Sequence, residues 1–262
     1  MLSLLLYQTV LPFLLSAFIV ILITIIAERY GTKVGGIFGT LPSTIIIAFI
    51  FIALNQGIDF AVTSVSVVPM QMGVNLIFLL IFVILAYKSL AIALTGSMIV
   101  WTFFSFLIFY YDLAHIGLSI GVYALCLICI FFYMEYVRKI PSVGKVHIKY
   151  TSKKILLRGI LAGTIIAISV ILSNTSAVLS GIFSIFPAIF SSTMIIALKE
   201  HGPHFSAGIA KSMIIGSMSV MSYAISIYYL YPIYGIWLGT LLAFSISFCI
   251  TLAIFYFRKK IK

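Results

Sequence analysis

The chain has 262 residues, of which 63% are hydrophobic and 8% are charged, and its formal net charge is +11. Soluble domains usually carry about 25% charged residues, so this composition excludes a protein whose whole surface faces water. The basic residues are spread between apolar segments without a concentrated basic face, which argues against a nucleic-acid partner.

Long apolar segments follow one another along the chain, and we predict that nine of them cross a membrane. About 20 apolar residues span the hydrocarbon core of a bilayer as a helix. Because a helix pairs its backbone polar groups within one segment, the predicted fold class is all-α, a polytopic membrane helix bundle. The predicted crossings lie at about residues 4–27, 36–55, 65–87, 89–110, 116–137, 155–173, 178–198, 207–230 and 233–257.

The basic residues predict the orientation of these crossings. All 16 Lys and Arg residues fall on one side of the nine-span arrangement, and the second, fourth, sixth and eighth connections contain none of them. Cytoplasmic connections of membrane proteins are enriched in Lys and Arg. We therefore predict a multi-pass protein of the cell membrane, with the lipid bilayer as partner, the N-terminus outside and the C-terminus in the cytoplasm.

Two similar stretches indicate an internal repeat. Residues 36–42 read GIFGTLP and residues 181–187 read GIFSIFP, at an offset of 181 − 36 = 145. At the same offset Gly57 meets Gly202. Because Gly and Pro matches arise by chance less easily than apolar ones, we predict a duplication.

The repeat and the number of crossings together predict the domain organisation. One crossing separates two blocks of four, so the second block starts on the opposite side of the membrane. The predicted architecture is a 4+1+4 arrangement of inverted repeats, which recurs in transporters. Its parts are a first four-helix repeat at 1–115, a linker helix with a basic cytoplasmic connection at 116–153, and a second four-helix repeat at 154–262.

The run from Ala27 to Ala61, AERYGTKVGGIFGTLPSTIIIAFIFIALNQGIDFA, resembles part of the small four-span GlpM-like integral membrane proteins. Those proteins have a first helix, a polar hinge, a GG-x-x-x-x-x-P element and three further spans. The second half resembles them more weakly, since it has Ser180-Gly181 in place of the double Gly. The resemblance implies a fold unit, here duplicated, and it implies no substrate or biochemical activity.

The repeated G-x-x-x-x-x-P elements and a few polar residues are the candidates for function. The elements form either hinges or half-helix ends that line a central pathway, or simple helix starts packed against their neighbours. The polar residues either contact a substrate or hydrogen-bond between helices, because buried amides and hydroxyls need partners. The pathway and hinge candidates are Gly36, Gly39, Pro42, Gln71, Asn75, Gly181, Pro187, Ser217 and Ser222.

Several pairs of glycines have the G-x-x-x-G spacing that permits close packing of membrane helices. Such packing occurs either within one chain or between the subunits of a homo-oligomer. The predicted packing residues are Gly117, Gly121, Gly159, Gly163, Gly235 and Gly239.

The pattern of acidic residues and the absence of catalytic motifs narrow the function further. The five acidic residues lie near predicted span ends, which disfavours ion coupling through a carboxylate at the midplane. No serine-hydrolase elbow, H-E-x-x-H, phosphate loop or carboxylate pair is present, so we expect no enzyme, metal site or cofactor. We predict a secondary transporter of a small neutral, amphipathic or anionic solute. The alternatives are a passive channel or pore and a non-transporting membrane scaffold or assembly protein.

Overall fold

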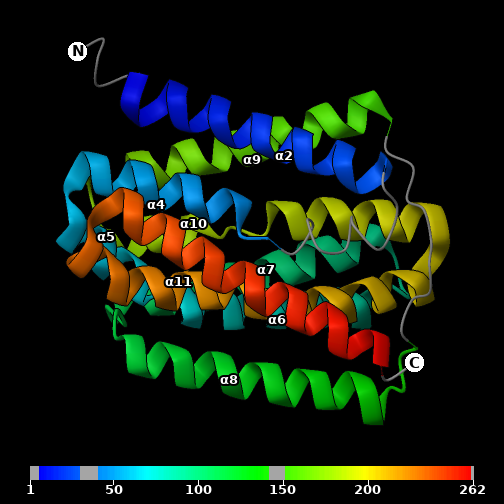
Figure 1. Ribbon diagram of the computed structural model, residues 1–262. Coiled ribbons are helices and arrows are strands. Elements are labelled where there is room, and N and C mark those ends of the chain that lie inside the picture. Colours follow the sequence, from blue (N-terminus) through cyan, green and yellow to red (C-terminus); the bar gives the residue numbers. More distant parts are fainter. Residues whose placement is uncertain (1–5, 30–40, 142–150, 261–262) are drawn as a thin grey trace.

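The computed structural model describes residues 6–29, 41–141 and 151–260, and these form helices without any strand. The all-α fold class is thus confirmed for the described part of the chain. In Figure 1 the helix axes lie roughly side by side, parallel or antiparallel, with α2 and α8 at opposite edges of the bundle. The elements are η1 (Leu6–Val10), α2 (Leu11–Arg29), α4 (Ser43–Gln56), α5 (Ile58–Ser66), α6 (Val68–Leu85), α7 (Leu90–Tyr110), α8 (Ile116–Phe132), η2 (Tyr133–Val137), α9 (Ser152–Leu172), α10 (Ala177–Ser184) and α11 (Ala188–Lys260).

The described helices are those of an integral membrane protein. Six helical segments among the described residues are long and apolar enough to cross a membrane. The outer helices expose large apolar side chains, among them Phe103 and Phe106 on α7 and Leu125 and Ile128 on α8. An apolar surface of this extent is not tolerated in water, so lipid covers these faces.

The last helix, α11, is interrupted twice. Gly202 has φ 79° and ψ −179°, and Gly235 has φ 72° and ψ −176°. Gly57, between α4 and α5, has nearly the same conformation, with φ 89° and ψ 169°. Since 202 − 57 = 145, this glycine break recurs at the offset found in the sequence. The breaks divide α11 into the segments 188–201, 203–234 and 236–260.

The seventh predicted crossing, 178–198, is broken near its middle. The helix α10 ends at Ser184 and α11 begins at Ala188, while Ile185 has the non-helical angles φ −123° and ψ 28°. Pro187 in this gap has no N–H to continue a helical ladder. The sequence predicted one crossing here and left open whether its G-x-x-x-x-x-P element forms a half-helix end or a simple helix start. The structure has two half-helices joined by an irregular segment.

The helix α6 forms the centre of the bundle. Most of its side chains between Val68 and Val83 are buried. It packs against α7, α8 and α11. Polar groups placed on this helix are therefore shielded from lipid by protein, which allows them to be hydrogen-bonded between helices.

The helices α2 and α9 cross at very short range. A Cβ atom on Gly159 would lie 2.6 Å from the side chain of Ile21, and one on Gly163 would lie 2.6 Å from the carbonyl oxygen of Phe13. Only glycine leaves room for α2 at these two positions. The G-x-x-x-G spacing of α9 thus coincides with a close helix contact within one chain.

The other predicted packing glycines are in different surroundings. A Cβ on Gly239 would lie 2.8 Å from the ring of Tyr231, so this position is also close-packed. A Cβ on Gly235 would meet none of the described residues within 4 Å, and Gly235 stands at the break in α11. Gly117 and Gly121 on α8 have nothing within 4 Å among the described residues. Gly117 and Gly121 therefore make no close helix contact with the described residues of the same chain.

Candidate functional site

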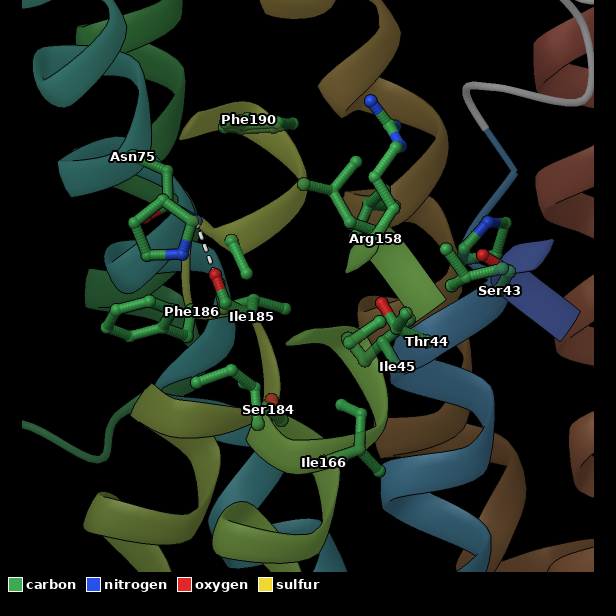
Figure 2. A pocket seen from close by; sticks show the side chains of 18 of the residues that line it. Ser43, Thr44, Ile45, Asn75, Arg158, Ile166, Ser184, Ile185, Phe186 and Phe190 are labelled. Carbon is green, nitrogen blue, oxygen red and sulfur yellow. Dashed lines mark hydrogen bonds between the residues drawn. The ribbon is translucent and has the colours of Figure 1, made fainter. Parts of the chain in front are cut away.

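A cavity of about 120 Å³ lies where the two halves of the chain meet. A buried water needs only about 10–15 Å³ of such space, so the cavity has room for several waters or a small solute. The two equivalent prolines, Pro42 and Pro187, both line it. The structure thus brings the two repeated G-x-x-x-x-x-P elements to one partly open space at their prolines. Figure 2 shows Arg158 and Thr44 on one side of this space and Asn75 and Phe186 on the other.

Two helices begin at the cavity. The helix α4 starts at Ser43, directly after Pro42, and α11 starts at Ala188, directly after Pro187. In Figure 1, α4 and the first segment of α11 (yellow) run in opposite directions from the middle of the molecule. The first four N–H groups of a helix have no partner within the helix and carry partial positive charge. Both N-terminal ends, with their partial positive charge, therefore lie at the same space.

Asn75 ties the irregular segment of the broken helix to the centre of the bundle. Its side chain is 1% exposed, and its Nδ2 donates to the carbonyl oxygen of Ile185 at 2.8 Å. The indole Nε1 of Trp101 donates to Asn75 Oδ1 at 2.8 Å. The Trp101 ring meets the Phe186 ring edge-on, with centroids 4.9 Å apart. These contacts fix the segment between α10 and α11 against α6 and α7.

Arg158 contributes the charge of the cavity. Among the described lining residues it is the only one with a charged side chain. Its Nη1 donates to Thr193 Oγ1 at 2.8 Å, and Arg158 has a further interaction besides this bond. The sequence counted Arg158 only among the basic residues that set the orientation. The one available signal was its position seven residues into α9, inside the helix and not in the connection before it.

Both halves of the chain match one family model, described as "Protein of unknown function (DUF3147)", at residues 9–114 and 155–260. The chain belongs to this family. Because the two matched regions are separate and similar in length, the chain carries the DUF3147 unit twice, as the internal repeat predicted. The description does not mention GlpM-like proteins, so that resemblance stays a prediction. No curated protein and no solved structure matches the chain.

The two DUF3147 regions contribute to the cavity in equivalent places but with different chemistry. Each region contributes one proline, Pro42 or Pro187, and the helix that starts after it. The amide of Asn75 comes from the first region, whereas Arg158 comes from the second region. The two regions thus supply similar helix starts and different polar side chains.

Gly181 stands in α10, the half-helix that precedes the break. A Cβ atom at this position would overlap the carbonyl oxygen of Ser64 and would lie 2.5 Å from the side chain of Val67. The hydroxyl of Ser184 donates to the Gly181 carbonyl at 2.7 Å, and Ser184 also lines the cavity. Close packing at Gly181 therefore sets how α10 sits on the junction of α5 and α6.

The other described pathway candidates, Gln71, Ser217 and Ser222, are not among the residues that line the cavity. Gln71 donates from Nε2 to Ser105 Oγ at 2.7 Å. Ser217 is 2.8 Å from the hydroxyl of Tyr123 on α8, and Ser222 donates to a carbonyl of its own helix at 2.7 Å. Gly36 and Gly39 are outside the described residues. Of the nine pathway candidates, the structure brings Pro42, Asn75 and Pro187 together at the cavity.

Proposed function

We propose that the protein is a secondary transporter of a small solute, working by alternating access between two inverted four-helix repeats. The observation that carries this proposal is the meeting of Pro42 and Pro187, one from each DUF3147 region, at one cavity. Discontinuous helices whose N-terminal halves point at a central site are a recurring construction of transporter binding sites. Movement of one repeat against the other would expose such a site to each side in turn.

The arrangement of half-helices supports an inverted relation between the repeats. The first segment of α11 and α4 both start beside the equivalent prolines and run in opposite directions (Figure 1). Two units inserted in the same sense would send these helices the same way. In this proposal the chain makes nine crossings, the N-terminus lies outside and the basic connections lie in the cytoplasm.

Labelling of positions that are 145 residues apart tests the inversion. In a variant with Cys126, Cys129 and Cys249 replaced by Ser, single cysteines are introduced as Lys88→Cys and Ile233→Cys. Both original side chains are exposed, so the label reaches them. We expect a membrane-impermeant maleimide to modify position 233 in intact cells and position 88 only after permeabilisation.

A second pair, Asp59→Cys and His204→Cys, serves as a control, since these positions have the same offset. Position 59 should react from outside and position 204 only from inside. Labelling of both members of either pair from one side would show that the repeats are parallel, and the proposed mechanism would then be wrong.

Reconstitution in lipid vesicles tests transport itself. We expect release of one or more small solutes from vesicles that contain the protein, at a rate that saturates with solute concentration. Pro187→Ala restores the N–H that a continuous helix from α10 into α11 requires and so favours closing the break, which should lower the rate at least tenfold. The readout is the initial rate of release at several solute concentrations.

Pro232→Ala is the matched control, because Pro232 lies inside α11 but is exposed and does not line the cavity. This variant should transport at the rate of the unchanged protein. Release that rises linearly with solute concentration would identify a passive pore. Equal rates for the two Pro variants would show that transport does not depend on the break at Pro187.

A further inference from the structure

A second cavity lies apart from the one at the two prolines. It is partly open and has a volume of about 530 Å³. Its described lining comes from the turn after α6, from the end of η2 with the residues that follow it, and from the second segment of α11. In the nine-span topology proposed above, these are the third, fifth and seventh connections, on the cytoplasmic side. We call this cavity the basic groove, and the polar side chains of its described lining are those of Tyr87, Arg138, Lys139 and His204.

The basic groove holds two cations that the described part of the chain does not neutralise. Arg138 and Lys139 are both exposed, and none of the described lining residues is acidic. Neither side chain takes part in an ion pair or a hydrogen bond with another described residue. The nearest acidic residue in the sequence, Glu135, is paired with Lys211. The groove therefore carries two positive charges without a counter-charge among the described residues.

A buried lysine holds the backbone that carries these two cations. Lys211 is 3% exposed, and its Nζ donates to the carbonyl oxygen of Ile140 at 2.6 Å. The N–H of Ile140 donates to the carbonyl oxygen of Met134 at 2.9 Å. Because Ile140 directly follows Arg138 and Lys139, both cations extend from a turn that is fixed to α11 and η2. Cations on a fixed backbone lose less conformational freedom when they bind a ligand.

The surroundings of the basic groove fit a lipid better than a free ion. Tyr87, whose hydroxyl lies 3.3 Å from Nδ1 of His204, is exposed, and tyrosines are enriched at the headgroup level of membranes. Val137 lines the groove and is exposed, and the preceding helix α8 exposes Ile128 and Phe132 on one face. A molecule with its charged group in the groove thus has exposed apolar side chains beside it, against which acyl chains can lie.

We propose that the basic groove binds the phosphate of an anionic phospholipid and that Arg138 and Lys139 are its charged contacts. Guanidinium and ammonium groups are the usual partners of phosphate oxygens in proteins. Basic pockets between helices on the cytoplasmic side bind lipid headgroups in other membrane proteins. Two basic residues at such a surface correspond to a preference of about thirtyfold for an anionic lipid over a zwitterionic one. The inference concerns binding alone, so it is tested without transport.

Native mass spectrometry of the full chain in detergent tests the proposal. The protein is mixed with equal amounts of dioleoyl phosphatidylglycerol and dioleoyl phosphatidylcholine, which share their acyl chains and differ in headgroup charge. We expect complexes with one phosphatidylglycerol to outnumber those with one phosphatidylcholine at least tenfold. The double variant Arg138→Gln with Lys139→Gln should lower this ratio to less than threefold. A ratio near one in the unchanged protein would overturn the proposal.

Lys153→Gln with Lys199→Gln is the matched control. It removes the same charge from exposed positions outside the groove lining, on the same side of the proposed topology. This variant should keep the tenfold ratio. An equal loss in both double variants would show attraction to the total charge of the chain and would overturn the groove as its site. Since all four side chains are exposed, both variants should melt within a few degrees of the unchanged protein.

Inorganic phosphate separates a lipid headgroup from a free ion. A ligand that binds the folded state raises the melting temperature. Phosphatidylglycerol should raise the melting temperature of the unchanged protein more than that of the variant without Arg138 and Lys139, whereas millimolar phosphate should affect both alike. If phosphate stabilised only the unchanged protein and displaced phosphatidylglycerol from it, the groove would be a site for free phosphate and the lipid proposal would be wrong. Failure of vesicle release would leave all of these results unaffected.

Discussion

Replacing Gly181 by Ala is expected to lower the free energy of unfolding by about 3 kcal/mol, the upper part of the usual range for overpacking. The added methyl group would overlap the carbonyl oxygen of Ser64 and crowd Val67. Backbone at the junction of α5 and α6 cannot move aside as the tip of a long side chain can. For a chain of this size, the apparent melting temperature in detergent should fall by about 10 °C.

Gly117→Ala and Gly121→Ala are the matched controls for Gly181→Ala. Both glycines are helical, and a Cβ at either meets nothing within 4 Å among the described residues. Alanine is the better helix former, so these variants should keep or slightly raise the melting temperature. An unchanged melting temperature for Gly181→Ala would refute the close contact with Ser64. A clear drop for the α8 variants would place that face in contact with a second copy of the chain.

Much of the fold was predictable because the bilayer leaves few alternatives. Long apolar runs must be helical in hydrocarbon, and the described helices α7, α8 and α9 begin within three residues of the predicted crossings. The duplication was also visible in the sequence, because glycine is kept at both positions 57 and 202. The structure gives the reason: both residues adopt a positive φ that other residues avoid. These features depend on local sequence alone, which is why the sequence revealed them.

The broken helix was less predictable because its cause is not local. Pro187 by itself fits the first turn of a helix as well as a gap between two helices. The gap is held open by Asn75, which lies 110 residues away in the chain and bonds the carbonyl of Ile185. A sequence pattern has no access to such a contact. For the same reason Asn75 emerged as a candidate while Trp101, its hydrogen-bond donor, did not.

Arg158 shows a second limit of the sequence argument. Basic residues near span ends are normally explained by membrane orientation, and Arg158 satisfied that rule together with its neighbours. Its place at the cavity follows only from the packing of α9 against α2 and α4, which brings this side chain to Thr193. A sequence pattern has no access to that packing.

Replacing Asn75 by Leu should lower the free energy of unfolding by about 2 kcal/mol and reduce transport at least tenfold. The substitution leaves the Ile185 carbonyl and the Trp101 N–H without their partner in a buried site, and each orphaned group costs about 1–3 kcal/mol before relaxation. Transport suffers more than stability because the segment from Ile185 to Pro187 lines the cavity. Thermal melting and vesicle release measure the two effects.

Gln71→Leu provides the sharpest contrast, since Gln71 is a buried amide one turn earlier on α6. Its Nε2 bonds Ser105, but its Oε1 has no partner among the described residues, so leucine removes an unsatisfied atom. The change should shift stability by less than about 1 kcal/mol and leave transport intact. If Gln71→Leu and Asn75→Leu lowered stability and transport equally, the contact of Asn75 with Ile185 would not be what positions the break.

A double-mutant cycle of Asn75→Leu with Trp101→Phe tests the hydrogen bond between these two side chains. The coupling energy should be about 0.6–1.7 kcal/mol, as for other interhelical hydrogen bonds in membranes.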